Sequence, residues 1–148
     1  MNYMKRAAEM FYALSGWKID GVIPPEIKRC VLILAPHTSN TDLLYARMMF
    51  FLDKRPAYFL IKSDYMRSPF KVIFKSIGAI GVERKQSTDM VERLSDLINA
   101  QEEIILGIAP EGTRGFSKRW KTGFYQIALE ARVPIALLYL DYRRKAVG

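Results

Sequence analysis

The sequence alternates short, continuously apolar runs with amphipathic segments, and this alternation constrains the fold more than any other feature. The run at 31–35 contains no polar residue and ends at Pro36, which is typical of a strand buried on both faces. Strands that alternate with helices predict an α/β fold with a mixed, largely parallel central sheet flanked by helices. The other expected strands span 57–61, 77–82, 104–109 and 135–141, and the expected helices span 3–15, 41–52, 70–77, 88–100 and 123–131.

The chain has 148 residues, which is the length of one domain and enough to bury roughly 70% of the surface exposed by the unfolded chain. No Pro-, Gly- or Ser-rich linker divides it, so we expect a single domain over 1–148. The single Cys30 excludes an internal disulfide and fits a reducing compartment.

The formal net charge of +8 is the first functional indication. A basic surface favours nucleic acid, anionic lipid headgroups or phosphorylated substrates, although a soluble protein without such partners can carry the same charge. Nucleic acid is the least favoured partner, because the aromatic residues lie inside apolar runs and are not interleaved with Lys and Arg.

Residues 1–17 contain an amphipathic segment that has two explanations. An ordinary docking helix would show this pattern, and so would an interfacial helix that places Phe11 and Trp17 near lipid headgroups. The chain has neither the ~20 consecutive apolar residues of a spanning helix nor a recognisable secretory signal. We expect a cytoplasmic protein that lies peripherally on the anionic inner face of the membrane.

A polar loop, Pro36-His37-Thr38-Ser39-Asn40-Thr41-Asp42, follows the strand at 31–35. If Asp42 lies in the first turn of the next helix, it can accept the Nδ1 proton of His37 and leave Nε2 to deprotonate a hydroxyl. Histidine suits this general-base role because its ordinary pKa of about 6.5 lies near working pH. Ser39-x-x-Asp42 also matches a helix capping box, so capping explains Asp42 equally well, and the two roles are compatible.

A second polar loop, Glu111-Gly112-Thr113-Arg114, follows the strand at 104–109. Parallel strands would open both loops onto the same edge of the sheet. Gly112 allows close approach of a ligand to the backbone, and Arg114 can hold a phosphate by a bidentate fork. Glu111 can accept a hydrogen bond from a polyol hydroxyl. A surface turn with an internal Glu–Arg pair would contain the same residues.

Two further cations follow expected strands, Lys62 after Ile61 and Arg84 after Val82. Each is a candidate for anion binding, and each is equally compatible with a solvated surface charge. One His and one Cys cannot make a common zinc site, and the glycine-rich loops that bind nucleotides are absent, so we expect no metal and no cofactor. A Gly-x-Ser-x-Gly nucleophile motif is absent as well.

Four short blocks occur in a characteristic order: His37-x4-Asp42, Gly81-Val82-Glu83-Arg84, Glu111-Gly112-Thr113-Arg114 and Val133-Pro134-Ile135. In order and spacing they resemble the glycerolipid acyltransferase family, which includes the lysophosphatidate (1-acylglycerol-3-phosphate) acyltransferases. The resemblance covers about residues 31–140. It implies the family's glycerolphosphate-acyltransferase-like fold, with a catalytic core at 31–141.

The resemblance also implies an activity, the O-acyl transfer of a fatty acyl group from acyl-CoA or acyl-carrier protein to a hydroxyl of a lysophospholipid such as lysophosphatidate. No acyl-enzyme, metal or cofactor is implied. By position in the blocks, His37 is the general base oriented by Asp42, and Arg84 and Arg114 bind the acceptor phosphate. Glu111 contacts the glycerol, and Gly112 and Thr113 belong to the same substrate-binding turn. Lys62 matches more loosely a Lys of the second block.

The sequence departs from the family pattern at two positions. Pro36 precedes His37 where many members have Asn, and Gly115 follows Arg114 where Ser is common. These departures leave the chemistry in place and the identity of the acceptor open. Two alternatives also stay open: a non-catalytic basic domain that binds membrane or nucleic acid, and an acyl-thioester hydrolase.

Overall fold

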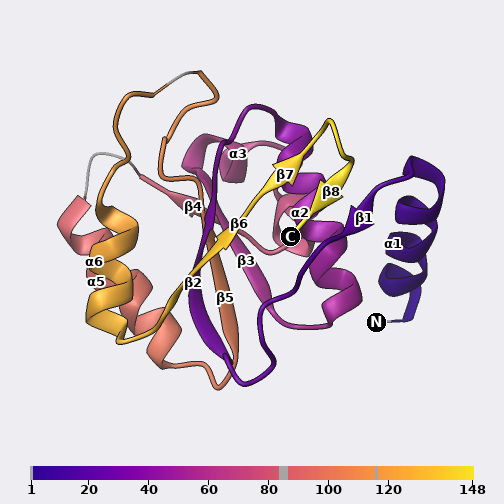
Figure 1. Ribbon diagram of the computed structural model, residues 1–148. Helices are drawn as coiled ribbons and strands as arrows, with labels where there is room; N and C mark the ends of the chain where they lie inside the picture. Colours follow the sequence, from indigo (N-terminus) through magenta and orange to yellow (C-terminus); the bar gives the residue numbers. More distant parts are fainter. Residues whose placement is uncertain (1, 84–86, 116) are drawn as a thin grey trace.

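The structure is a computed structural model that describes residues 2–83, 87–115 and 117–148 (Figure 1). Five strands form a central sheet in the order β4-β3-β5-β2-β6, and every neighbouring pair is parallel. Helices flank this sheet, which confirms the expected α/β class. The strands are β2 (Arg29–Leu34), β3 (Ala57–Lys62), β4 (Ala79–Val82), β5 (Ile104–Ile108) and β6 (Ile135–Leu138).

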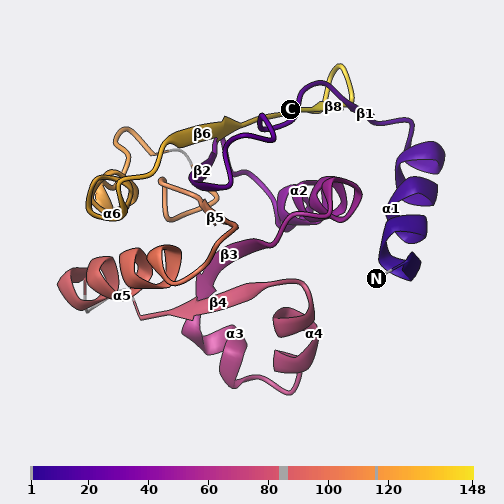
Figure 2. The same ribbon diagram turned by 90° about the horizontal axis from the view of Figure 1, so that it is seen from below.

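The side chains of β2 alternate between two hydrophobic cores, which explains why the run has no polar position. Cys30, Leu32 and Leu34 pack in the core beneath α2 (Asn40–Asp53). Val31 and Ile33 pack on the opposite face, in the core that contains residues of α5 (Ser87–Asn99) and α6 (Gly123–Ala131). Figure 2 shows α5 and α6 on one side of the sheet and α2, backed by α1 (Asn2–Ser15), on the other.

Two short helices, α3 (Ser63–Arg67) and α4 (Lys71–Ser76), connect β3 to β4 at the outer edge of the sheet (Figure 2). The expected helix at 70–77 corresponds to α4. The sequence does not predict α3, because a single turn is too short to show a helical repeat of apolar residues.

The expected strand at 135–141 is wrong in its length. β6 ends at Leu138, and the chain then leaves β2: the backbone of Tyr139 exchanges hydrogen bonds of 2.8 and 3.2 Å with Gly148. The next residues form a separate three-stranded sheet in the order β1-β8-β7, which joins the first and last segments of the described chain (Figure 1). Its strands are β1 (Lys18–Ile19), β7 (Leu140–Asp141) and β8 (Ala146–Val147).

The amphipathic helix α1 packs against α2 through one face. Ala8 and Tyr12 are buried, and the hydroxyl of Tyr12 donates a hydrogen bond of 2.8 Å to the carbonyl oxygen of Tyr45. On the other face, Tyr3 and Leu14 are 84% and 80% exposed. α1 therefore docks on α2 through its buried face. Contact of its exposed face with a membrane stays a prediction. Within the described residues, no helix combines the length and apolarity needed to cross a bilayer.

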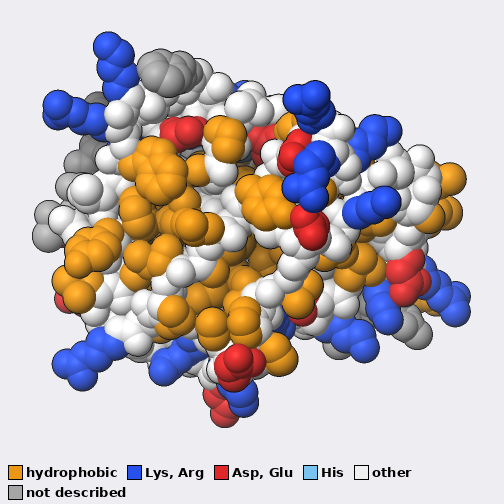
Figure 3. Space-filling view, viewed as in Figure 1, with side chains coloured by type: hydrophobic (Ala, Val, Ile, Leu, Met, Phe, Trp, Pro, Cys, Tyr) orange, Lys and Arg blue, Asp and Glu red, His pale blue; other side chains and the backbone are white. Residues whose placement is uncertain are grey.

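The edge of the central sheet formed by β6 also exposes apolar side chains. Figure 3 shows hydrophobic side chains gathered over β6 and α6, where β6 is the edge strand. Leu129 on α6 and Leu137 on β6 are 66% and 71% exposed. The surface of the molecule thus has more than one apolar region.

Candidate active site

The loop after β2 brings His37 and Asp42 together. Nδ1 of His37 lies 3.1 Å from Oδ2 of Asp42, so the contact expected from the sequence is present. The side chain of Asp42 is 1% exposed and that of His37 is 19% exposed. Because a carboxylate only accepts, Nδ1 carries the proton of this hydrogen bond, and in the neutral imidazole Nε2 then has a free lone pair. The geometry is that of an imidazole oriented for proton abstraction.

The same carboxylate caps α2. Oδ2 of Asp42 accepts the backbone N–H groups of Thr38 at 2.7 Å and Ser39 at 2.8 Å. Ser39 is the N-cap residue, and its hydroxyl oxygen accepts the N–H of Thr41 at 3.1 Å, which completes a capping box. The two explanations of Asp42 left open by the sequence therefore describe a single arrangement, because the cap and the contact with His37 share one oxygen.

A residue that the sequence did not single out completes the environment of Asp42. The hydroxyl of Tyr142 donates a hydrogen bond of 2.5 Å to Oδ1 of Asp42, across 100 residues of sequence. Burial of this hydroxyl, together with its hydrogen bond to Asp42, raises the pKa of Tyr142 well above its ordinary value. The phenol therefore stays protonated and acts as a donor. One feature of the sequence could have indicated Tyr142: it directly follows the last expected strand, at the edge of the sheet where the two polar loops open.

Aromatic packing holds Tyr142 in place. Trp17 stacks on Tyr45 of α2, with ring centroids 3.9 Å apart and planes inclined by 24°. The ring of Tyr142 meets Trp17 edge-on at 5.1 Å. Since Trp17 precedes β1 and Tyr142 follows β7, the small sheet delivers both rings to the start of α2. This contact between distant segments fixes the direction from which the Tyr142 hydroxyl approaches.

Glu111 joins the two polar loops. β2 and β5 are parallel neighbours, so both loops open at the same edge as expected. Oε2 of Glu111 accepts the backbone N–H of His37 at 2.9 Å. Among the described residues, Glu111 and Arg114 make no ion pair, so the internal pair considered from the sequence is not formed. Glu111 instead fixes the position of the His37 backbone through this hydrogen bond.

The turn after Glu111 requires glycine. Gly112 has a φ of +63°, in the left-handed region, and a Cβ there would lie 3.0 Å from Nζ of Lys121. The long side chain of Lys121 therefore lies over the turn. Thr113 is exposed, and its hydroxyl oxygen accepts the N–H of Gly115 at 3.2 Å. The backbone of this turn is shaped by its own residues and by Lys121.

The candidate phosphate-binding cations lie further from the imidazole. Arg114 is exposed, and its Nη2 lies 3.4 Å from the hydroxyl oxygen of Tyr65 on α3. Lys62, at the end of β3, is also exposed and forms an ion pair with Asp64. Arg84 lies outside the described residues. The structure thus unites His37, Asp42 and Glu111, and it places Arg114 beside α3 on the same edge.

Comparison with protein families decides among the activities considered. The model of the family described as Acyltransferase matches residues 18–140. The chain belongs to the acyltransferase family. The match confirms the resemblance found in the four ordered blocks, and it includes both polar loops with His37, Asp42 and Glu111. No curated protein matches the chain.

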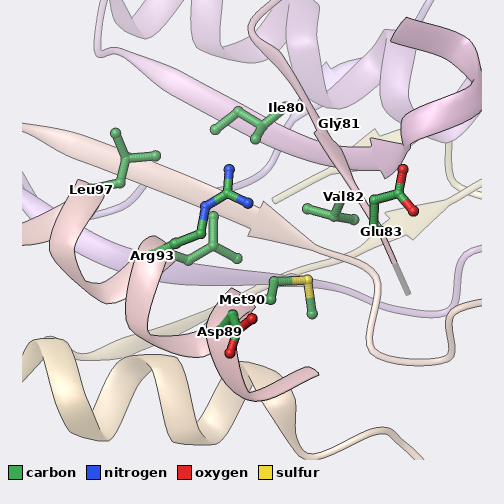
Figure 4. Close-up of a pocket in the computed structure, with 9 residues that line it drawn as sticks. Ile80, Gly81, Val82, Glu83, Asp89, Met90, Arg93 and Leu97 are labelled. Carbon is green, nitrogen blue, oxygen red and sulfur yellow. The ribbon is translucent and has the colours of Figure 1, made fainter. Parts of the chain in front are cut away.

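Acyl transfer is therefore the chemistry of this acyltransferase. A separate cavity lies away from the imidazole. The cavity has a volume of about 200 Å³ and lies between β4 and α5, where the side chain of Arg93 extends toward Ile80 (Figure 4). Its lining includes Glu83 of the second block but neither His37 nor Asp42. It is smaller than the ~300 Å³ at which small-molecule sites begin, and we assign it no ligand.

The described residues contain no group of three or more His, Cys, Asp or Glu side chains that could hold a metal ion. Cys30 is fully buried within β2 and packs in the core next to α2. This burial is incompatible with a role for Cys30 as a nucleophile paired with His37.

Proposed function

We propose that this acyltransferase moves a fatty acyl group from an acyl thioester to a hydroxyl group of a lysophospholipid such as lysophosphatidate. The observation that carries the proposal is the contact of 3.1 Å between Nδ1 of His37 and a buried carboxylate. A carboxylate in this position orients the ring and stabilises the imidazolium once Nε2 has taken a proton.

The proposed reaction needs a single proton acceptor. Nε2 of His37 removes the proton of the acceptor hydroxyl while its oxygen attacks the thioester carbonyl carbon. A C–O bond forms, the C–S bond breaks, and the proton passes from the imidazolium to the departing thiolate. Four donors surround the two oxygens of Asp42: the N–H groups of Thr38 and Ser39, the imidazole and the hydroxyl of Tyr142.

The proposed acceptor contacts follow from charge and position. Arg114, with Arg84 and Lys62, would hold the phosphate, since a guanidinium binds phosphate oxygens in pairs. Glu111 would meet the glycerol with the oxygen that does not accept the N–H of His37. The donor would be acyl-CoA or acyl-carrier protein, without a metal or cofactor. We further propose that the protein acts peripherally at the anionic inner face of the cytoplasmic membrane.

Transfer of labelled acyl groups to a panel of lysophospholipids tests the proposal. General-base catalysis contributes roughly 10²- to 10⁴-fold, so His37→Ala should lower kcat at least about 100-fold. Asn40→Ala is a suitable control, because Asn40 is exposed on the first turn of α2 and is expected to leave the rate unchanged. Turnover that is equal in His37→Ala and the wild type would refute the role of His37. Thioester hydrolysis that is indifferent to every acceptor would identify a hydrolase instead.

A further inference from the structure

The turn from α3 into α4 exposes a compact group of large apolar residues. Phe70, Val72 and Ile73 are 60%, 69% and 58% exposed. Single exposed apolar residues are ordinary on protein surfaces, but three within four consecutive positions form a patch. α4 lies at the outer edge of the sheet next to β4, and Figure 2 shows no other described helix or strand on its outer side. We call Phe70, Lys71, Val72, Ile73 and Lys75 the α4 surface.

Positive charge surrounds these apolar side chains. Residues 62–76 contain four Lys or Arg and one Asp, which gives this segment a net charge of 4 − 1 = +3. Arg67 pairs with Glu83 at 2.6 Å, and Lys62 pairs with Asp64. Within the part of the chain that the structure describes, Lys71 and Lys75 have no acidic partner within 4.0 Å. The α4 surface therefore presents two uncompensated ammonium groups beside apolar side chains.

Contacts connect the α4 surface to the candidate active site. Phe74 of α4 packs against Tyr65 of α3, with ring centroids 5.5 Å apart and planes inclined by 60°. The hydroxyl oxygen of Tyr65 in turn lies 3.4 Å from Nη2 of Arg114. Two successive contacts therefore link α4, through Tyr65, to the guanidinium proposed to bind the acceptor phosphate.

We propose that the α4 surface rests on an anionic lipid bilayer, with its apolar side chains among the acyl chains and its lysines against the phosphates. Apolar side chains combined with Lys are the chemistry of interfacial binding, in which apolar burial and attraction to anionic lipid act together. The inference rests on the proposed function, because a lysophospholipid acceptor resides in a membrane. Docking through α4 places the source of acceptor beside Arg114.

The other exposed apolar regions fit this partner less well. On α1, Lys5 pairs with Glu9 at 3.6 Å, so part of the positive charge of that helix is already compensated. On α6, the exposed Leu129 is followed directly by Glu130. Charge complementarity to an anionic bilayer therefore singles out α4.

Cosedimentation of the full chain with phosphatidylcholine vesicles, with and without phosphatidylglycerol, tests this inference. Each Lys near an anionic surface strengthens binding roughly fivefold, so Lys71→Glu with Lys75→Glu should weaken binding to the anionic vesicles at least about tenfold. Val72→Ser with Ile73→Ser should cause a loss of at least about tenfold by removing buried apolar area. Leu14→Ser on α1 and Leu129→Ser on α6 are matched controls, being 80% and 66% exposed, and should bind as the wild type does.

Unchanged vesicle binding in both α4 double variants would overturn the inference, and so would a loss confined to Leu14→Ser. Thermal unfolding checks that the variants fold. Acyl transfer to a short-chain lysophosphatidate dissolved as monomers separates this inference from the proposed function. The α4 variants should keep that soluble activity while losing transfer to acceptors in vesicles. A wild-type protein that binds vesicles through α4 but transfers no acyl group would refute the proposed function alone.

Discussion

The hydroxyl of Tyr142 donates a hydrogen bond of 2.5 Å to Oδ1 of Asp42, whose other oxygen contacts His37. The donor comes from the segment after β7, while the carboxylate caps the helix that follows β2. The two oxygens of Asp42 thus have separate functions. Oδ2 accepts the N–H groups that cap α2 and also contacts the imidazole. Oδ1 accepts the hydroxyl of Tyr142, which follows a strand of the small sheet.

We expect Tyr142→Phe to lower kcat about tenfold, which corresponds to roughly 1.4 kcal/mol of lost transition-state stabilisation. The ring and its packing on Trp17 are preserved, so the effect isolates the hydroxyl. A carboxylate that loses a donor attracts the imidazolium proton more strongly, and the acidic limb of the kcat/KM profile should therefore move to higher pH. Steady-state kinetics as a function of pH measures both effects.

Tyr139→Phe is the matched control for this experiment. Tyr139 lies three residues before Tyr142, and its hydroxyl donates a hydrogen bond of 2.8 Å to Asp20, away from the imidazole. We expect this variant to keep the wild-type pH profile. Equal losses in the two variants, without a shift in either profile, would show that Tyr142 acts only by stabilising the small sheet.

The surroundings of Asp42 predict different effects for two substitutions. In Asp42→Asn the amide oxygen can take the place of Oδ2 and the amide nitrogen can donate to the hydroxyl oxygen of Tyr142, so the fold should persist while charge stabilisation of the imidazolium is lost. In Asp42→Ala the N–H groups of Thr38 and Ser39 lose their acceptor, which should destabilise the protein by about 1–3 kcal/mol.

Urea unfolding and acyl-transfer assays on both Asp42 variants test this difference. Both should be at least about 100-fold less active than the wild type, because neither can stabilise a protonated His37. Full activity in Asp42→Asn would contradict the role of the carboxylate charge and leave only helix capping.

Arg114→Ala should raise KM for a phosphorylated acceptor more than KM for the thioester donor. The expected loss is about 1.5–3 kcal/mol, the usual contribution of a hydrogen bond to a charged group. Lys118→Ala provides a control, since Lys118 is another exposed cation of the same loop. An equal rise in both KM values would indicate that Arg114 shapes the loop and does not contact the acceptor.

Cys30 should resist thiol reagents in the native protein. Burial raises the pKa of this thiol from 9.0 to about 11, so it stays protonated at pH 8 and is inaccessible as well. Ellman's reagent should detect one thiol per chain only after unfolding. Because folding raises this pKa, the contribution of Cys30 to stability is fully present below pH 9 and is lost as the pH rises through about 11. Rapid labelling of the native protein would contradict the observed burial.

Local sequence patterns were sufficient to predict the layers and the contact between His37 and Asp42. The apolar runs and helical periods lie within single elements, and His37 and Asp42 are five residues apart, so a capping box already brings them close. The order of the strands could not be predicted in this way, because no local pattern indicates that β6 lies beside β2. The contribution of Tyr142 depends on that order, on the departure of the chain at Tyr139 and on two-residue strands that are too short to recognise.

The small sheet has a consequence for how the protein is made. The ribosome adds Tyr142 as the 100th residue after Asp42, so a nascent chain can cap α2 and bring His37 to its carboxylate long before the phenol exists. The pair can therefore form before its last donor, which depends on the segment that runs through β7 and β8 to pair with β1. An incomplete chain would carry the imidazole and its carboxylate while lacking the phenol, and the Tyr142→Phe variant reproduces that state.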